Sequence, residues 1–494
     1  MNAQFFSLLV SRRLGMLVSG PESAHFRPGC FRARWPKHPA KPRNLRASRI
    51  APMAMAFLLL FADVGLANPT APAVVNGTAT FAISGKQLTV TNTPGTIINW
   101  AGFSIAKDET TRFNQPSAAS VVLNRVTSTD PSSILGTLSS NGRIFLINPN
   151  GILFGSGSRI DTQGFLASTL DISDKDFLAG RWRFTGDGGR IEAQGRIDGG
   201  SGDVWLLSPD IVQQGGITSQ GGQVVLAAGR KVEFSGSGLD GIYFEVQAPT
   251  DRAVNLGTVS AGAVGMFAAS LSQLGALGAS TISREGGRIL LKASRDTLVS
   301  GSVTAIGTNG KGGSIDILGH QVDVTGSASI DVSGTTGGGN VRIGGSFDVS
   351  NAQTYIRGTG IRADATEQGD GGKVILWSDG TIWADLSFSL RSGPRGGNEG
   401  FMGVSAKLGA TIFLPEPPTT PELSTPCGCN PDNWASPILG TSSIIVPSQP
   451  NATVVSVTGF AQTSHLALPW NTLFRFPRPS PIVVAMPTPG TEAP

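Results

Sequence analysis

Cysteine, histidine, tyrosine and charged residues are all scarce in this sequence. Its 494 residues include 3 Cys, 4 His and 2 Tyr, and 15% are charged, against about 25% in a typical soluble domain. So few cysteines exclude a disulfide scaffold. Beyond residue 67 the histidines are His320 and His465, which leave little material for a metal site. The 66 glycines would each cost roughly 1 kcal/mol inside a helix, so the composition favours an all-β chain.

The basic residues are concentrated at the N-terminus. Residues 1–67 hold ten Lys and Arg against two acids, which leaves 28 basic and 32 acidic residues in the rest of the chain. A net charge of about −4 on that remainder removes the main reason to expect nucleic-acid binding. We therefore predict no nucleic-acid partner, and we predict no cofactor, catalytic residue or metal.

A secretory signal peptide is predicted to end at Ala67. Residues 53–62 form a ten-residue apolar run, and Gly65-Leu66-Ala67 supplies small residues at the −3 and −1 positions of a cleavage site. The run is about half the roughly 20 residues that a membrane-spanning helix needs. We expect residues 1–67 to be a basic leader plus signal peptide, with a start at Met16 as an open alternative.

Three compositional zones follow the leader. Residues 68–185 show strand-like alternation, residues 186–414 are rich in glycine, and residues 415–494 hold 16 of the 31 prolines. In the middle zone a glycine pair followed by a short β-rich run recurs, and its last four copies are 26, 26 and 33 residues apart. The pairs are Gly188-Gly189, Gly221-Gly222, Gly286-Gly287, Gly312-Gly313, Gly338-Gly339 and Gly371-Gly372.

This period predicts an all-β fold, a right-handed parallel β-helix (β-solenoid) with an N-terminal capping region and a Pro-rich tail. Each coil presents a few inward apolar side chains, and stacked coils give them one continuous core. Glycine is expected at corners that need positive φ. A β-sandwich or propeller is the rival fold, but the Asn-Gly turns typical of hairpins are few.

The most specific pattern lies between residues 113 and 155. It contains Gln115-Pro116, Asn124-Arg125 and Asn141-Gly142, and it ends in Asn148-Pro149-Asn150-Gly151-Ile152. These elements resemble the secretion domain of two-partner-secretion exoproteins, the filamentous-haemagglutinin-like (haemagglutination activity domain) family. The Asn-Pro-Asn-Gly-Ile element is the hallmark of that family, and the resemblance runs from about residue 74 to residue 180.

The resemblance implies a secreted or cell-surface, adhesin-like protein of a Gram-negative bacterium. It also implies export across the outer membrane by a partner β-barrel transporter, and it suggests a host cell-surface receptor or glycan as a further partner. The secretion motif would be Asn148, Pro149, Asn150, Gly151 and Ile152, supported by Gln115, Pro116, Asn124, Arg125, Asn141 and Gly142.

The hallmark element also has a purely structural interpretation. Asn148 is able to cap its own turn, Pro149 fixes φ, and Asn150-Gly151 tolerates left-handed conformations. The flanking residues Ile144, Leu146, Ile152 and Phe154 alternate as inward strand positions. A turn that closes an early coil and a recognition element for a transporter are compatible, and both stay open.

Two alternatives to an adhesin-like protein remain. A polysaccharide-active β-helical enzyme would need carboxylates that converge on one groove, and Asp316 and Asp323 are candidates only if the coils stack suitably. The other alternative is a truncated passenger without binding activity. In the tail, Cys427 and Cys429 are too close for an unstrained disulfide. The pair is either without consequence or a tether, as at the ends of some surface-retained members of the resembling family.

Overall fold

The computed structural model describes residues 68–236, 238–245, 250–346 and 349–413, together with three short strands at 443–445, 454–458 and 482–485. The predicted leader, the cleavage site at Ala67 and the pair Cys427 and Cys429 lie outside the described residues. Within the described ranges, no helix is long and apolar enough to cross a membrane.

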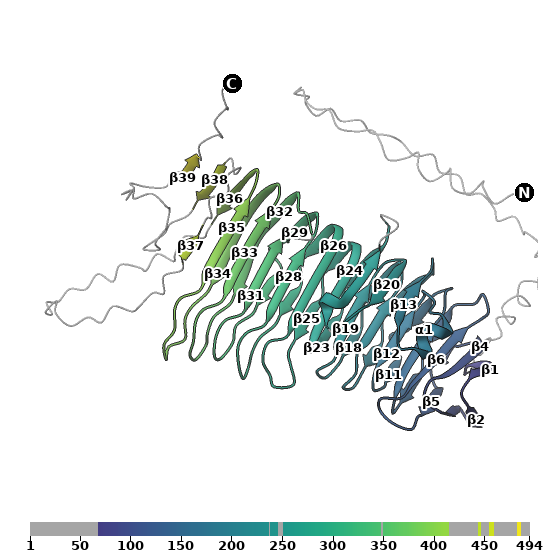
Figure 1. The fold of residues 1–494 in the computed structure, drawn as a ribbon. Coiled ribbons are helices and arrows are strands. Elements are labelled where there is room, and N and C mark those ends of the chain that lie inside the picture. The colour runs from purple at the N-terminus through teal and green to yellow at the C-terminus, as the bar shows by residue number, and fades with distance from the viewer. Residues whose placement is uncertain are drawn as a thin grey trace, which may run out of the picture. The chain divides into compact units, whose positions relative to one another are not determined.

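Three parallel strand ladders build the fold, and successive coils add their strands to each (Figure 1). This arrangement confirms the predicted all-β, parallel β-helix. Ladder A contains β4 (Thr96–Gly102), β6 (Val121–Val126), β9 (Arg143–Ile147), β12 (Phe165–Ser168), β16 (Val204–Leu207), β19 (Gln223–Ala227), the first parts of β24 (Ala263–Gln273) and β26 (Arg288–Val299), β28 (Ser314–Leu318), β31 (Asn340–Gly344), β33 (Lys373–Ser378), β35 (Phe401–Ala406) and β37 (Ser443–Ile445).

Ladders B and C complete each coil. Ladder B contains β7 (Ser132–Ile134), β10 (Ile152–Phe154), β14 (Arg190–Ala193), β17 (Asp210–Gln213), β22 (Arg252–Asn255), the second parts of β24 and β26, β29 (Gln321–Val324), the first parts of β32 (Gln353–Arg362) and β34 (Thr381–Ser389), β36 (Gly409–Phe413) and β38 (Val454–Thr458). Ladder C contains β3 (Gln87–Asn92), β5 (Thr110–Asn114), β8 (Thr137–Ser140), β11 (Arg159–Asp161), β15 (Arg196–Asp198), β18 (Gly216–Thr218), β23 (Thr258–Ala261), β25 (Ala276–Ala279), β27 (Ser302–Thr304), β30 (Ser329–Asp331) and the second parts of β32 and β34.

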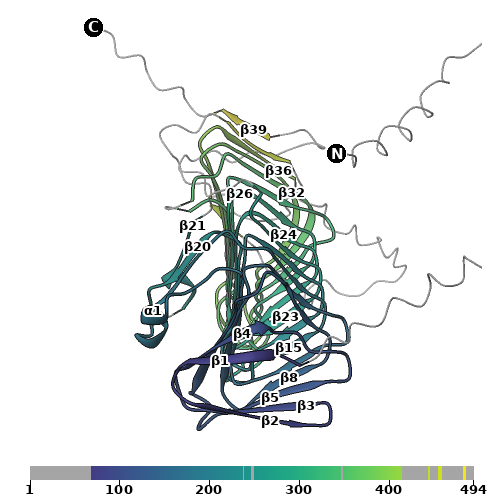
Figure 2. The ribbon, with the colours of Figure 1, turned by 90° about the vertical axis from the view of Figure 1, so that its right-hand side faces the viewer.

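Antiparallel strands close the N-terminal end of the ladders, as the predicted capping region requires. β1 (Thr70–Asn76) pairs with β4, β2 (Ala79–Ser84) pairs with β3, and both strands lie across the first coils in Figure 2. Trp100 of β4 is fully buried and packs edge-on against Phe81 and Phe103. In the Pro-rich zone, β38 pairs antiparallel with β39 (Ile482–Ala485).

Inward-facing apolar side chains stack in register along the ladders. One column in ladder A runs through Ile144, Phe165, Val204, Val224, Val264, Ile289, Ile315, Val341, Val374 and Met402, each at most 2% exposed. Burial of apolar surface contributes about 25 cal/mol per Å². Because a single coil cannot enclose its part of the column, this stabilisation depends on the stacking of neighbouring coils.

Five of the six recurring glycine pairs stand where ladder A strands begin, whereas Gly188-Gly189 precedes β14 of ladder B. Close backbone contact explains the pairs in the later coils. A Cβ on Gly313 would lie 1.9 Å from the carbonyl oxygen of Gly287, and one on Gly339 would lie 2.1 Å from that of Gly313. The φ angles of these three glycines are not positive. The expectation that corners need glycine for positive φ is therefore wrong at these positions, where glycine permits close stacking instead.

Two segments leave the coil and pair with each other on its outside. α1 (Asp174–Leu178) and β13 (Trp182–Thr185) follow β12, whereas β20 (Lys231–Phe234), the short 3-10 helix at Leu239–Gly241 and β21 (Ile242–Glu245) follow β19. β13, β20 and β21 form a separate antiparallel sheet, and Figure 2 shows α1, β20 and β21 beside the ladders. We call α1 and these three strands the outer layer.

The outer layer covers apolar side chains that point outward from ladder A. Phe145 lies 5.2 Å from Trp182 between ring centroids, and Trp205 stacks on Phe234 at 4.0 Å. Leu166, between Phe145 and Trp205 in the ladder, is 1% exposed. The early coils therefore have a second hydrophobic core outside the main one.

A row of alternating charges crosses ladder B at Asp210. Its carboxylate accepts hydrogen bonds from Arg190 Nε at 2.9 Å and Arg252 Nε at 2.8 Å. Burial raises the pKa of Asp210, but the hydrogen bonds from Arg252 and Arg190 outweigh burial, so this pKa lies below its ordinary value. A lowered pKa in the folded state stabilises the protein above the unfolded-state pKa, and this contribution is lost as pH falls through the lowered value.

We expect Asp210→Asn to lower the Tm at neutral pH because the two arginines lose their shared carboxylate. The difference from the unsubstituted chain should begin to shrink below about pH 4, the ordinary pKa of an aspartate in the unfolded chain, and should disappear as pH falls through the lower folded-state pKa of Asp210. Thermal unfolding followed by circular dichroism from neutral to acidic pH measures this. A Tm difference that does not change with pH would contradict the ionic origin of the stabilisation.

Candidate functional site

The Asn-Pro-Asn-Gly element forms the corner between ladders A and B in an early coil. β9 ends at Ile147 and β10 begins at Ile152, so residues 148–151 are the entire connection. Asn148 is 0% exposed, whereas Pro149 and Asn150 are exposed. The flanking residues Ile144, Leu146, Ile152 and Phe154 belong to the buried core, as predicted.

The Asn148 side chain ties this corner to the preceding coil. Its Nδ2 donates to the carbonyl oxygen of Asp130 at 2.9 Å and to Ser132 Oγ at 3.0 Å. Its Oδ1 accepts from the backbone N–H of Asn150 at 3.0 Å, so Asn148 caps its own turn. Asn150 Nδ2 in turn donates to the carbonyl oxygen of Ser128 at 2.8 Å. Ser132 lies within the sequence pattern at 113–155, but the pattern did not indicate that residues 128–132 contact Asn148 and Asn150.

The following coil closes the other side of the corner. Gly189 N–H donates to the carbonyl oxygen of Pro149 at 2.7 Å. Gly151 has a φ of +118°, and a Cβ there would lie 3.2 Å from the carbonyl oxygen of Arg190. The φ of Asn150 is not positive, so the left-handed expectation applies to Gly151 alone. The element thus fastens three consecutive coils together.

Gln115, Asn141 and Gly142 meet at a different corner, between ladders C and A. Gln115 N–H donates to Asn141 Oδ1 at 2.8 Å, and Asn141 Nδ2 donates back to the Gln115 carbonyl oxygen at 2.7 Å. Gln115 Nε2 donates to the carbonyl oxygen of Arg143 at 2.9 Å. A Cβ on Gly142 would lie 2.6 Å from Gln115 Nε2, so glycine makes room for this amide. Pro116 is exposed beside them.

Asn124 points inward from β6. It is 0% exposed, and its Oδ1 accepts a hydrogen bond from the indole N–H of Trp100 at 3.0 Å. Its Nδ2 donates to the carbonyl oxygen of Phe145 at 3.3 Å. A buried amide therefore satisfies a buried indole donor, which would otherwise be left without a partner in the core.

Arg125 points outward from the same strand and holds the start of the outer layer. Its Nε lies 3.0 Å from Asp171 Oδ1 and its Nη1 lies 2.8 Å from Asp174 Oδ1. Its Nη2 donates to the carbonyl oxygen of Ile172 at 2.7 Å. Burial lowers the pKa of Arg125, but Asp171 and Asp174 raise it by more than burial lowers it. The pKa therefore lies above its ordinary value, and the guanidinium stays charged. Asp171 and Asp174 are motif partners that sequence reasoning missed.

The predicted motif residues do not converge on one pocket. They divide between two corners and the two faces of β6, and internal hydrogen bonds occupy most of their polar atoms. Pro116, Pro149 and Asn150 are exposed. The arrangement is able to order the early coils and to present two corner surfaces.

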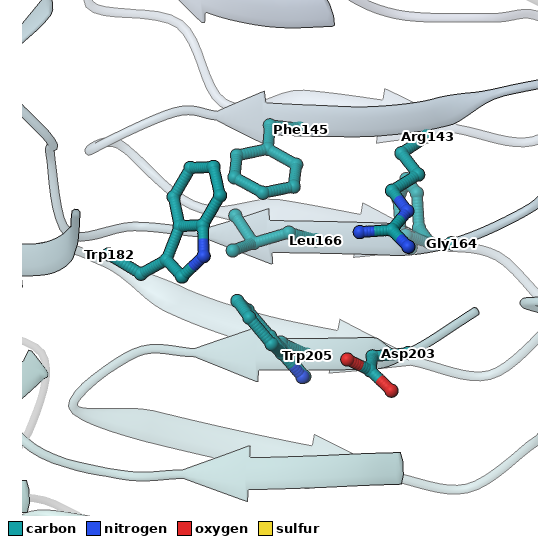
Figure 3. Close-up of a pocket in the computed structure, with 8 residues that line it drawn as sticks. Arg143, Phe145, Gly164, Leu166, Trp182, Asp203 and Trp205 are labelled. Atoms are coloured by element: carbon teal, nitrogen blue, oxygen red, sulfur yellow. The ribbon is translucent and has the colours of Figure 1, made fainter. Parts of the chain in front are cut away.

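A small hollow lies beside the outer layer on the outward face of ladder A (Figure 3). Figure 3 shows Trp182 and Trp205 beside Leu166, with Arg143 and Asp203 farther along the strands. The full lining is Arg143, Phe145, Gly164, Phe165, Leu166, Trp182, Asp203 and Trp205. Its volume of about 30 Å³ accommodates roughly one water molecule, so it is a gap in the packing of the second core rather than a ligand pocket.

The candidate carboxylates for catalysis are divided between two ladders. Asp316 of ladder A lies 3.6 Å from Arg288 and 3.8 Å from Arg342, while Asp323 of ladder B lies 2.9 Å from Arg357. Burial raises the pKa of Asp316, although Arg342 and Arg288 oppose this. Among the residues that the structure describes, no three His, Cys, Asp or Glu side chains gather as a metal site.

Comparison with known proteins identifies the family to which the chain belongs. A family model described as the TPS secretion domain matches residues 65–311, which is half of the chain. The chain belongs to the two-partner-secretion exoproteins. The solved HMW1 secretion domain from Haemophilus influenzae is 33% identical, with a TM-score of 0.64 over 69% of this chain and 95% of that one.

Two heme/hemopexin-binding proteins of Haemophilus influenzae are further relatives of this two-partner-secretion exoprotein. One, from strain Rd, is 39% identical over 105 residues, which are 21% of this chain and 12% of the relative. The other is 35% identical over 88 residues, which are 18% of this chain and 10% of the relative. The aligned part therefore spans about an eighth or less of these curated relatives.

Membership of this family indicates where the protein is located and how it is exported. The chain is a secreted, cell-surface exoprotein of a Gram-negative bacterium, and its secretion domain implies a partner transporter in the outer membrane. The family match extends to residue 311, past the predicted boundary at 185 and into the glycine-rich zone. None of these relatives is described as an enzyme.

Proposed function

We propose that this exoprotein is adhesin-like: the early coils direct its export and the later coils display a binding surface. The observation that carries the proposal is the cross-coil fastening at Asn148–Gly151 within a parallel β-helix that continues to residue 413. Early coils fastened in this way serve as a template on which later coils stack one after another. A continuous stack in turn offers flat outer strand faces for contact with a partner.

We propose that Asn148, Pro149, Asn150, Gly151 and Ile152, supported by the cluster around Gln115 and by Arg125, act in export chiefly by ordering these coils. Support comes from burial: Asn148 and Asn124 are 0% exposed, so a transporter would not contact their side chains in the folded state. Before folding, the same strands are free to add to the edge of a transporter module. Folding outside the outer membrane then biases movement of the chain outward.

The heme and hemopexin binding in the names of two relatives is not carried over, because the aligned segment covers 12% and 10% of those proteins. We also propose that the chain is not an enzyme. Support is the division of Asp316 and Asp323 between ladders, together with the two arginine partners of Asp316 and the one of Asp323. The glycine-rich zone to residue 414 and the tail 415–494 would form the displayed passenger, with Cys427 and Cys429 available as a tether.

Adherence measured after expression with the partner transporter tests this function. We expect non-adherent Gram-negative cells to display the chain and to bind epithelial cells or a glycan-coated surface. Cells that carry the transporter alone are the control. Display without any gain in adherence would contradict the adhesin-like role, and release of sugars from acidic polysaccharides, abolished by Asp316→Asn or Asp323→Asn, would favour the enzyme instead.

A further inference from the structure

The outward face of the late ladder B strands carries aromatic and hydrogen-bonding side chains in register. The inward positions of these strands, such as Ile356 and Ile382, are buried in the core, so the alternate residues face outward. These outward residues are Gln321 and Asp323 on β29, Gln353, Tyr355 and Arg357 on β32, Thr381, Trp383 and Asp385 on β34, and Thr411 and Phe413 on β36. We call this set the aromatic grid.

Neighbouring side chains position the rings of the grid. Tyr355 and Trp383 are register partners on adjacent strands, about 4.8 Å apart along the ladder. Arg357 lies over the Tyr355 ring, 5.8 Å from its centroid, and the Trp383 ring lies 5.4 Å from that of Phe413. Trp383 nevertheless stays 37% exposed. The grid therefore offers ring surface to a ligand at two successive coils.

Charged and polar groups flank the two rings. Arg357 Nη2 lies 2.9 Å from Asp323 Oδ2, and the other oxygen of this carboxylate, Oδ1, is buried without a hydrogen-bond partner among the described residues. Asp385 is the register partner of Arg357 on the next strand, and Gln353 and Thr381 lie on the other side of the rings. Two carboxylates and one guanidinium give the grid a net charge of about −1, which disfavours acidic ligands.

This combination fits a sugar chain. A pyranose ring presents an apolar C–H face that stacks on an aromatic ring, while its hydroxyl groups at the rim donate to carboxylates and accept from guanidinium or amide groups. We propose that the aromatic grid binds neutral oligosaccharides, with successive sugar rings on Tyr355 and Trp383. The proposal rests on the adhesin-like function and names its ligand class. The grid also lies beyond residue 311, outside the matched secretion domain.

Binding of the secreted full-length chain to defined oligosaccharides tests this site. The probes are cellohexaose and chitohexaose, which are neutral, and heparin, which is acidic. We expect a neutral hexamer to bind and Trp383→Ala or Tyr355→Ala to weaken binding at least about tenfold. Tyr243→Ala is the matched control. Tyr243 is the other tyrosine of the chain, is 51% exposed, and has Lys231 Nζ 5.3 Å from its ring centroid. It lies in the outer layer, away from the grid.

Several outcomes would overturn the proposal. The proposal fails if neither neutral hexamer binds or if the chain prefers heparin. It also fails if the Trp383→Ala and Tyr243→Ala chains bind with equal affinity and show unchanged circular dichroism. Self-association lost in Trp383→Ala without sugar binding would assign the surface to a second copy of the chain. Adherence that survives Trp383→Ala overturns the grid as the site but leaves the adhesin-like function standing, whereas a displayed wild-type chain without adherence contradicts that function.

Discussion

Asn148→Ala is expected to trap the exoprotein in the periplasm, where it is degraded. The substitution removes two hydrogen bonds to the preceding corner and leaves the Asp130 carbonyl oxygen and Ser132 Oγ without that partner. Ser132 is 1% exposed, and a buried group left without a partner costs about 1–3 kcal/mol. Since Asn148 stands in an early coil, its loss also disturbs the template for every later coil. Extracellular and periplasmic amounts, measured by immunoblot with the transporter co-expressed, give the result.

Asn351→Ala is the matched control for a late coil. Asn351 is also a fully buried asparagine at a corner between ladders A and B, and its Nδ2 donates to the carbonyl oxygens of Gly319 at 2.7 Å and Gln353 at 3.1 Å. We expect a similar loss of stability but continued export, because the early coils stay intact. Equal export of the two variants would leave Asn148 with a purely structural role.

Pro149→Ala separates ordering of the coil from recognition by the transporter. Pro149 is exposed at the corner, and only its carbonyl oxygen, which alanine retains, accepts a hydrogen bond from Gly189. If export depends on ordering, Pro149→Ala should be exported nearly as well as the unsubstituted chain. Periplasmic retention of Pro149→Ala with an unchanged Tm would instead show that the transporter recognises the exposed corner directly.

The regular part of the fold was predictable from sequence because its determinants are local and repeated. Short apolar alternation and glycine pairs such as Gly312-Gly313 recur at the coil length, and from Gly221-Gly222 onward each copy stands directly before a ladder A strand. What sequence reasoning misjudged was the role of glycine at pairs such as Gly312-Gly313, since the approach of one backbone to the next coil depends on stacking. That approach is visible only when Gly287 and Gly313 are placed one above the other.

The candidate site was predictable as a set of residues but not as a geometry. The Asn-Pro-Asn-Gly turn follows from local conformational preferences, and Asn148 caps it as expected. Its partners Asp130 and Ser132, and the partners of Arg125, come from other coils or from the outer layer. β13 and β20 pair although they are about 50 residues apart in the sequence, as the register partners Arg183 and Glu233 show. No sequence pattern in either strand indicates this pairing.

A fragment that ends at residue 185 is expected not to fold cooperatively, whereas residues 68–311 should. β13 pairs with β20, so without residues 231–234 this strand lacks its partner, and Phe184, which is fully buried, loses its contact with Phe234. Exposing each large apolar side chain costs about 1.5–3 kcal/mol, and several together approach the about 5–15 kcal/mol that stabilises a whole domain.

Both fragments end in an exposed coil, so the outer layer is what distinguishes them. Urea unfolding followed by circular dichroism should give a sigmoidal transition for residues 68–311 and a gradual, protease-sensitive loss of signal for residues 68–185. A cooperative transition in the shorter fragment would show that the coils up to residue 185 fold without the outer layer. The predicted domain boundary at 185 would then mark an independent unit, and the second core would be an addition to it rather than a condition for its folding.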